Sequence, residues 1–151
     1  MVSVEPGQLP SGVAVPDGTQ AIAVPDGTLP SRMGIVIREA SPQRVVGTMP
    51  VEGNIQPYGL LHGGASCVLA ETLGSIGAAL HARESFDGIA VGVDISATHH
   101  RGLRAGVVTG VATAIHLGGQ VASYDIAITD EEGRRICTAR LTCMLQRPRS
   151  A

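Results

Sequence analysis

Residues 56–75 read QPYGLLHGGASCVLAETLGS and lead into the one run of this sequence that is long enough to be a major helix. The run covers 63–82, and helical spacing is shown by Val68, Leu69, Thr72, Ile76, Ala79 and Leu80. Many of its other residues are small, so neighbouring elements can pack closely against it. We therefore expect a long helix that the rest of the chain must cover.

Short runs of strand character flank this helix on both sides. Two precede it, at 33–38 and 44–49, and the turn-forming stretch between them predicts a hairpin. Four follow it, with turns at Gly118-Gly119 and at 130–134, and they cover 89–97, 106–117, 120–129 and 135–145. The order β-β-α-β-β-β-β predicts an α+β domain in which an antiparallel sheet curls around the helix.

The first thirty residues have a different character from the rest. They are rich in Pro and Gly, and the hexapeptide Ala-Val-Pro-Asp-Gly-Thr occurs at 14–19 and again at 23–28. Two copies are too few for a repeat fold, whereas Pro-Asp-Gly is typical of turns. We expect an irregular N-terminal arm over 1–30, packed or disordered, followed by one domain over 31–151.

Composition excludes several classes of protein. The 151 residues carry a net charge of -2 with no Lys, and one Phe, two Tyr and no Trp, so neither a broad basic surface nor a set of stacking aromatic rings is available for nucleic acid. The N-terminus does not resemble a signal peptide, and Glu71 interrupts the most apolar stretch, 63–80, so we expect no membrane span. Three cysteines, an odd number, indicate reduced thiols and a cytoplasmic protein: Cys67, Cys137 and Cys143.

The residues able to take part in a reaction lie at the start and in the middle of the predicted helix. His62-Gly63-Gly64 lies at the helix start, where free N–H groups and the positive end of the helix dipole suit a developing oxyanion. Glu71 lies in mid-helix among apolar and small residues, where a carboxylate is costly unless it is paired or used; the alternative is an exposed carboxylate on the helix surface. Gln56 and His62 are able to hydrogen-bond a substrate, although each taken singly is more often structural.

A metal site is not expected. Of the five histidines, adjacent His99 and His100 would point to opposite faces of a strand and so cannot hold one ion together. No Cys and His pair has the spacing of zinc ligands. The sequence therefore predicts neither a metal nor a cofactor.

These motifs resemble a known family. His62-Gly-Gly-Ala-Ser followed by Leu69-Ala-Glu-Thr-Leu-Gly-Ser is similar to the hotdog-fold acyl-CoA thioesterases, in particular the branch with 1,4-dihydroxy-2-naphthoyl-CoA, enterobactin proofreading and 4-hydroxybenzoyl-CoA thioesterases. The similarity continues through VGVDISATHHR from Val91, IHLGG from Ile115 and DEEGRRIC from Asp130, and it spans about residues 29–145. It implies the hotdog fold, a long helix wrapped by a curled sheet.

The resemblance also implies roles for individual residues. Glu71 would be the nucleophile or general base, and the Gly63 N–H would polarise the thioester carbonyl, with Gln56 and His62 positioning it and Ser75 holding the hydrolytic water. Arg101 and Arg104 suit phosphate groups, unless they belong to a solvated strand end. The residues implied in binding coenzyme A are Gly92, His99, His100, Arg101, Gly102, Arg104, His116, Leu117, Gly118, Gly119, Gln120 and Val121.

The expected activity is hydrolysis of an aromatic acyl-CoA, such as 1,4-dihydroxy-2-naphthoyl-CoA or 4-hydroxybenzoyl-CoA, to the free acid and coenzyme A. One alternative is a proofreading thioesterase with broad specificity for acyl-CoA or acyl-carrier-protein substrates. A dehydratase or hydratase on the same fold would use a different pattern, with a catalytic Asp-His or Glu-His pair. A non-catalytic acyl-CoA-binding protein should lack the mid-helix carboxylate.

Helix geometry adds an expectation about assembly. Gly63 and Glu71 are eight residues apart, which is about 12 Å along a helix at 1.5 Å per residue. A nucleophile must approach the carbonyl carbon to within about 3–3.5 Å. Glu71 should therefore act on a carbonyl held by Gly63 of a second subunit, across a two-fold axis. We expect a homodimer with shared sites, and the resemblance implies that two dimers pair into a homotetramer.

Overall fold

The computed structural model describes residues 13–14, 20–21 and 24–147, and its central element is the helix α2 (Gly63–Phe86). Six strands form one sheet: β3 (Val36–Ala40), β4 (Arg44–Pro50), β5 (Ile89–His99), β6 (Val107–Leu117), β7 (Val121–Thr129) and β8 (Arg135–Gln146). The remaining elements precede the sheet and are short: β1 (Val13–Ala14), β2 (Gln20–Ala21) and α1 (Leu29–Arg32).

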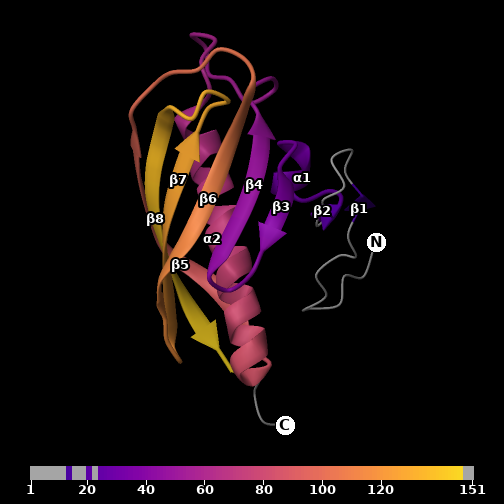
Figure 1. Cartoon of the computed structure of the whole chain (residues 1–151), viewed down its shortest axis with the longest axis vertical. Coiled ribbons are helices and arrows are strands. Elements are labelled where there is room, and N and C mark those ends of the chain that lie inside the picture. The colour runs from indigo at the N-terminus through magenta and orange to yellow at the C-terminus, as the bar shows by residue number, and fades with distance from the viewer. Residues whose placement is uncertain (1–12, 15–19, 22–23, 148–151) are drawn as a thin grey trace.

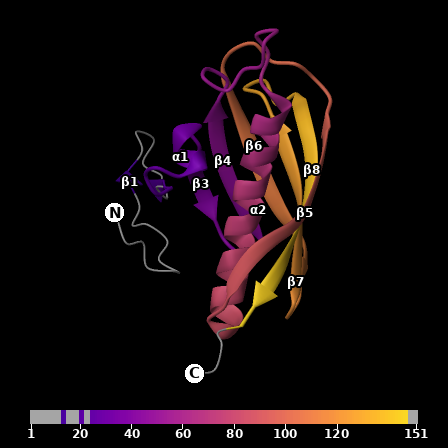
Figure 2. The same cartoon turned by 180° about the vertical axis from the view of Figure 1, so that it is seen from behind.

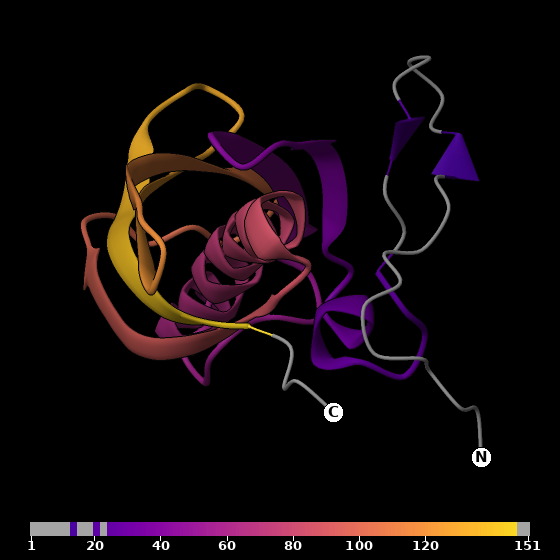
Figure 3. The ribbon, with the colours of Figure 1, turned by 90° about the horizontal axis from the view of Figure 1, so that it is seen from below.

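The six strands are antiparallel throughout and run in the order β3-β4-β6-β7-β8-β5. Figure 1 shows the sheet lying along α2, and the view along the helix in Figure 3 shows that the strands curve around it. The sheet leaves β3 and β5 as its two edges. The predicted α+β hotdog architecture is therefore confirmed.

Close contact between helix and sheet depends on small residues on both sides. Gly47 of β4 and Gly110 of β6 are cross-strand partners, and a Cβ at either position would overlap the side chain of Leu73. Leu69 and Leu73 are fully buried in this contact. The side of α2 that faces the sheet consists of Ala65, Ser66, Leu69, Ala70, Leu73, Gly74, Gly77, Ala78 and Ala82.

Most of the residues that indicated helical spacing are only partly covered. Leu69 is buried, whereas the other five are half-buried, namely Val68, Thr72, Ile76, Ala79 and Leu80, and of these Val68 and Ile76 still pack against the core. Figure 2 shows that one side of α2 faces away from the sheet. The helix is apolar on both sides, but within one chain the sheet covers only one of them.

Five elements end later than the sequence predicted, namely α2, β3, β4, β5 and β8, and two of them show why. The helix continues beyond residue 82 to Phe86 and ends where Asp87 adopts the left-handed conformation, with φ 53°. The strand expected at 89–97 continues to His99 because its pairing with β8 holds to the His99–Cys137 pair. Both differences are at element ends, where local pattern is weakest.

The N-terminal arm lies largely outside the described residues. Its second hexapeptide forms the expected turn, because the Thr28 N–H and hydroxyl both donate to the Pro25 carbonyl, at 3.3 and 2.7 Å, and Gly27 has φ 78°. The short helix α1 follows directly and crosses the expected boundary at residues 30 and 31. The division into an arm and a domain stays a prediction.

By length and composition alone, α2 could cross a membrane. Its most apolar 18 residues have a mean hydropathy of 1.2, and 44% of that window is buried inside the protein. The same apolarity is what a helix needs when a sheet curls around it. The fold therefore supplies a reason for the composition of this segment.

Candidate active site

The start of α2 is held in place by the loop that precedes it. Asn54 is buried, and its side-chain amide donates to the carbonyls of Met33 and Pro50, both at 2.9 Å. The backbone carbonyl of Asn54 accepts a hydrogen bond from the His62 N–H at 2.9 Å. Through its side chain and its backbone, Asn54 thus ties the loop carrying Gln56 to the first residue before the helix.

His62 is the N-cap of α2. Its Nδ1 accepts a hydrogen bond from the Gly64 N–H at 2.8 Å, so in the neutral ring the proton is on Nε2. The neighbouring Gly63 N–H has no acceptor within the described part of the chain, as is normal for the first turn of a helix. The structure thus leaves one donor open at the positive end of the helix dipole.

A cavity of about 310 Å³ lies beside this open donor. Gly63 lies close to His99 at the end of β5, and a Cβ on Gly63 would be 2.7 Å from His99 Nε2. The walls combine the loop before α2, the first turn of α2, and the segment after β5: Gln56, Leu60, Leu61, Gly63, Ser66, His99, His100, Arg101, Gly102 and Ile136.

Glu71 lies two turns further along α2, against the edge strand β5. A Cβ on Gly92 would overlap Glu71 Oε1, so the carboxylate occupies the space that any other residue at position 92 would fill. Ser75, one turn beyond, donates its hydroxyl to the same oxygen at 3.3 Å. The carboxylate is half-buried between helix and strand.

A buried thiol completes this second cluster. Cys143 of β8 is the cross-strand partner of Gly92 and is fully buried. Burial raises the pKa of the Cys143 thiol, the Ser75 hydroxyl lowers it, and the negative charge of Glu71 raises it again. The net direction is upward, so Cys143 stays protonated beside the carboxylate.

Residues 58–137, more than half of the chain, match the family model described as the thioesterase superfamily. This chain belongs to the thioesterase superfamily. The predicted hydrolase activity and hotdog fold are thereby confirmed.

Individual relatives agree with this assignment. The proofreading thioesterase EntH of Cronobacter sakazakii is 47% identical over 117 residues, which are 77% of this chain and 84% of that protein. A mutant thioesterase of Pseudomonas aeruginosa, PA1618, superimposes with a TM-score of 0.74 at 41% identity, over 79% of this chain and 86% of the other. A hypothetical thioesterase protein of Streptococcus pneumoniae, solved with coenzyme A, gives a TM-score of 0.68 at 25% identity, covering 80% of this chain and 92% of that chain.

The structure brings some of this thioesterase's predicted site residues together and separates others. Six of them line the one cavity at the start of α2: Gln56, Gly63, His99, His100, Arg101 and Gly102. Arg104 lies in the segment after β5 too, where its Nη1 donates to the Tyr58 carbonyl at 3.1 Å. His99 Nε2 lies close to Gly63, and His100 Nε2 pairs with Thr138 Oγ1 on β8 at 3.0 Å.

The segment from His116 to Val121 lies elsewhere. It forms the β6–β7 hairpin, where the Gly118 N–H donates to the Val121 carbonyl and the Gly118 carbonyl pairs with His81 Nε2 at 2.8 Å. His81 is eighteen residues beyond Gly63, or about 27 Å along the helix. Apart from Gly92, the residues assigned to coenzyme A therefore form two groups near opposite ends of α2.

Sequence reasoning missed two features of the site. Ser66 is buried in the cavity wall one turn from Gly63, and helical spacing from His62 was a signal for it. Cys143 was interpreted only as a reduced thiol, because no sequence pattern shows that β8 pairs with β5 and places position 143 opposite Gly92. Gly92, assigned to coenzyme A, lies directly against Glu71.

Among the His, Cys, Asp and Glu side chains that the structure describes, no group of three or more is arranged to hold a metal ion.

Proposed function

We propose that this thioesterase hydrolyses an aromatic acyl-CoA with Glu71 as its catalytic carboxylate and the Gly63 N–H as the donor to the thioester oxygen. The observation that carries the proposal is the pair of complementary half-sites. The start of α2 has an open donor beside a cavity, and the middle of α2 has a carboxylate held by Ser75. Polarisation and nucleophilic attack are the two functions that thioester hydrolysis requires.

The chemistry follows from these groups. The Gly63 N–H stabilises negative charge on the carbonyl oxygen as the carbon is attacked, either by a Glu71 oxygen or by water that Glu71 deprotonates. The C–S bond then breaks, and the coenzyme A thiolate leaves with its electron pair and takes up a proton. If Glu71 attacks directly, water hydrolyses the resulting anhydride and restores the carboxylate.

We propose further that each site is shared by two subunits. Within one chain, the Glu71 cluster is about 12 Å along the helix from Gly63, and the two coenzyme A groups are about 27 Å apart along it. A two-fold axis beside the first half of α2, between Gly63 and His81, would bring Glu71 and the β6–β7 hairpin of one chain toward Gly63 and His99 of the other. A solved relative that holds coenzyme A supports this class of substrate.

Exposed apolar side chains support such a dimer. The edge strand β5 has no partner on its outer side within the described chain, and it exposes Val91, Val93 and Ile95 by 45%, 56% and 36%. A second row crosses the outer face of the sheet, where Met144 is the partner of both Val91 and Val121. We infer that β5 and the uncovered side of α2 form the dimer, and that the outer row lets dimers pair into a tetramer.

The three described cysteines are free thiols, which supports a cytoplasmic location.

The test of substrate class is a steady-state panel of acyl-CoAs. We expect 4-hydroxybenzoyl-CoA and 1,4-dihydroxy-2-naphthoyl-CoA to show higher kcat/KM than acetyl-CoA or palmitoyl-CoA. A clear preference for either straight-chain substrate would contradict the aromatic assignment while leaving the thioesterase activity intact.

A second candidate is a proofreading thioesterase of broad specificity, favoured by the 47% identity to EntH. The same panel separates the two, provided that it includes acyl groups carried on a carrier protein. Comparable kcat/KM across the whole panel, with carrier-protein substrates among the best, would favour proofreading over one dedicated aromatic substrate.

A further inference from the structure

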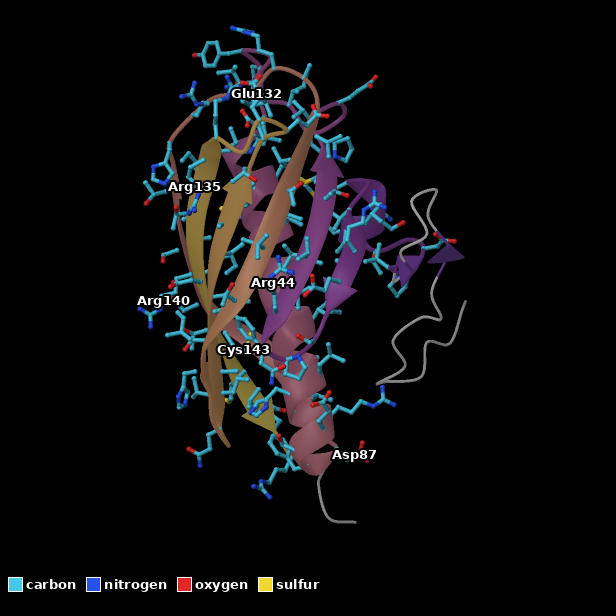
Figure 4. All side chains as sticks on the ribbon, viewed as in Figure 1. Arg44, Asp87, Glu132, Arg135, Arg140 and Cys143 are labelled. Carbon is cyan, nitrogen blue, oxygen red and sulfur yellow. The ribbon has the colours of Figure 1, made fainter. Side chains whose placement is uncertain are left out.

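We propose that His81 is a positioning residue for the coenzyme. It holds the β6–β7 hairpin so that the Gly119 N–H points outward and is free to donate to the nucleotide phosphates of the substrate. The proposal rests on the proposed function, in which this hairpin contacts coenzyme A. Figure 4 shows Asp87, after the end of α2, and Glu132, in the β7–β8 turn, at opposite ends of the molecule, and the hairpin lies at the Asp87 end.

The bond between His81 and the hairpin has one possible direction. The Gly118 carbonyl oxygen only accepts, so His81 Nε2, at 2.8 Å from it, carries a proton and donates. In the neutral ring Nδ1 is then an acceptor, and the Ser85 hydroxyl lies 3.4 Å from it, one turn further along α2. His81 is half-buried, so the bond to Gly118 is partly shielded from water.

The hairpin lacks the bond that usually closes a β-turn. In such a turn the first carbonyl accepts from the N–H three residues later, but in the described chain no bond runs from the Val121 N–H to the Gly118 carbonyl. The Gly118 N–H donates to the Val121 carbonyl at 2.9 Å, and the Leu145 N–H donates to the Gln120 carbonyl at 2.8 Å. The Gly118 carbonyl is therefore held from outside the turn, by His81.

Fixing the Gly118 carbonyl also fixes the N–H that follows it. A trans peptide is planar, so its C=O and its N–H point in opposite directions. Because the Gly118 carbonyl turns toward α2, the Gly119 N–H points away from α2, and it has no acceptor within the described chain. A Cβ on Gly119 would meet nothing within 4 Å, so the position is open. A free backbone N–H in a turn is a donor of the kind that binds phosphate oxygens.

Distance decides which part of the reaction His81 affects. His81 is ten residues beyond Glu71, about 15 Å along α2. A group this far from the reacting carbon neither polarises the carbonyl nor aligns the attacking oxygen. In an acyl-CoA the thioester is at one end of the pantetheine arm and the nucleotide phosphates are at the other. Loss of His81 should therefore weaken binding of the coenzyme and leave the chemical step unchanged.

The experiment measures kcat, KM and thermal midpoint for H81A, H81N and H81Q. Two substrates carry the same acyl group: the best acyl-CoA of the panel, and the matching acyl-pantetheine, which lacks the nucleotide. Gln places an amide donor near the position of Nε2, whereas Asn places one only near Nδ1, so the two variants are matched donors of different reach. We expect H81A and H81N to raise KM for the acyl-CoA about 3- to 10-fold, the net effect of one hydrogen bond, with kcat unchanged. H81Q should recover most of the affinity, and all three variants should keep kcat/KM for the acyl-pantetheine.

The proposal is overturned if H81A lowers kcat/KM by the same factor on both substrates, because a purely structural role would affect both alike. An unchanged KM for the acyl-CoA would also overturn it. If H81A does not fold, H81Q and H81N decide: equal KM values for the acyl-CoA would show that the bond to Gly118 does not matter. The proposed function fails separately, because it requires Glu71→Ala to be inactive on both substrates whatever the His81 variants do.

Discussion

The start and the middle of α2 differ in what each lacks. The start has a cavity, an unpaired N–H on Gly63 and two histidines close by, but no carboxylate among the lining residues. The middle has the Glu71 carboxylate and its Ser75 partner but lies outside that cavity. Buried contacts of Asn54 hold the start of α2, whereas the Glu71 carboxylate lies against Gly92 of β5. Under the proposed function the two regions are halves of one site, and each half requires the other as its complement.

The largest expected effect comes from removing the carboxylate half. Glu71→Ala should lower kcat/KM by at least about 10²–10⁴, the range for loss of a catalytic base. The thermal midpoint should change little, because Glu71 is half-buried and its hydrogen bond to Ser75 is long. Turnover close to wild type in a folded variant would mean that the middle of α2 is not part of the active site.

The next effect tests whether the two halves meet across a subunit boundary. Glu71→Ala and Gln56→Ala are each assayed alone and then mixed under conditions that exchange subunits. In a shared site, the mixed dimer has one centre with both residues intact and one with neither. Random mixing in equal amounts should therefore restore about a quarter of the wild-type activity.

Subunit exchange must be verified independently, for example by mass-tagging one variant. Exchange without any recovered turnover would show that both halves serve a site within one chain. The exposed apolar strand β5 would then need a different explanation.

A smaller effect should follow from closing the space around Glu71. Gly92→Ala would force the carboxylate to move, and a displacement of about 1 Å can cost up to 10²-fold in rate. We expect about a tenfold loss in kcat. In a Glu71→Asp background the shorter side chain leaves room, so the same substitution should cost much less.

A double-mutant cycle of Gly92→Ala and Glu71→Asp separates a steric effect on the carboxylate from a general loss of stability. If Gly92→Ala lowers kcat equally with Glu or Asp at position 71, the close approach of Gly92 to the carboxylate does not matter for catalysis. The middle of α2 would then tolerate looser packing than its geometry suggests.

The two regions were also unequally readable from the sequence. The start of α2 could be predicted because its signals are local. His62, Gly63 and Gly64 are adjacent, and the start of a helix has free N–H groups. The order of the helix and strands could be predicted from the spacing of apolar residues, because this spacing is kept when a sheet curls around a helix. Element ends, such as Phe86 and His99, were underestimated because pairing with distant strands decides them.

The middle of α2 could be predicted only in part. Glu71 stood out as a charge among apolar residues, but its surroundings depend on strand pairing between β5 and β8. Gly92 lies about fifty residues from Cys143 in the sequence, and no local pattern links them. The buried side of α2 was obscured for a similar reason: both sides are apolar, and only tertiary contact shows which one the sheet covers.

The smallest effect concerns the start of α2, where His62 caps the helix and is proposed to position the substrate. Its Nδ1 caps the helix through the Gly64 N–H, while Nε2 is the atom left to position a substrate. His62→Ala should lower the free energy of unfolding by about 1 kcal/mol, the usual cost of a lost N-cap, and the thermal midpoint by about 2–4 °C. His62→Asn replaces the cap acceptor and should keep wild-type stability. It supplies no group at the position of Nε2, so a catalytic role predicts the same loss of kcat/KM in both variants. If Asn restores activity together with stability, His62 acts only by holding Gly63 in place, and the donor half of the site consists of backbone alone.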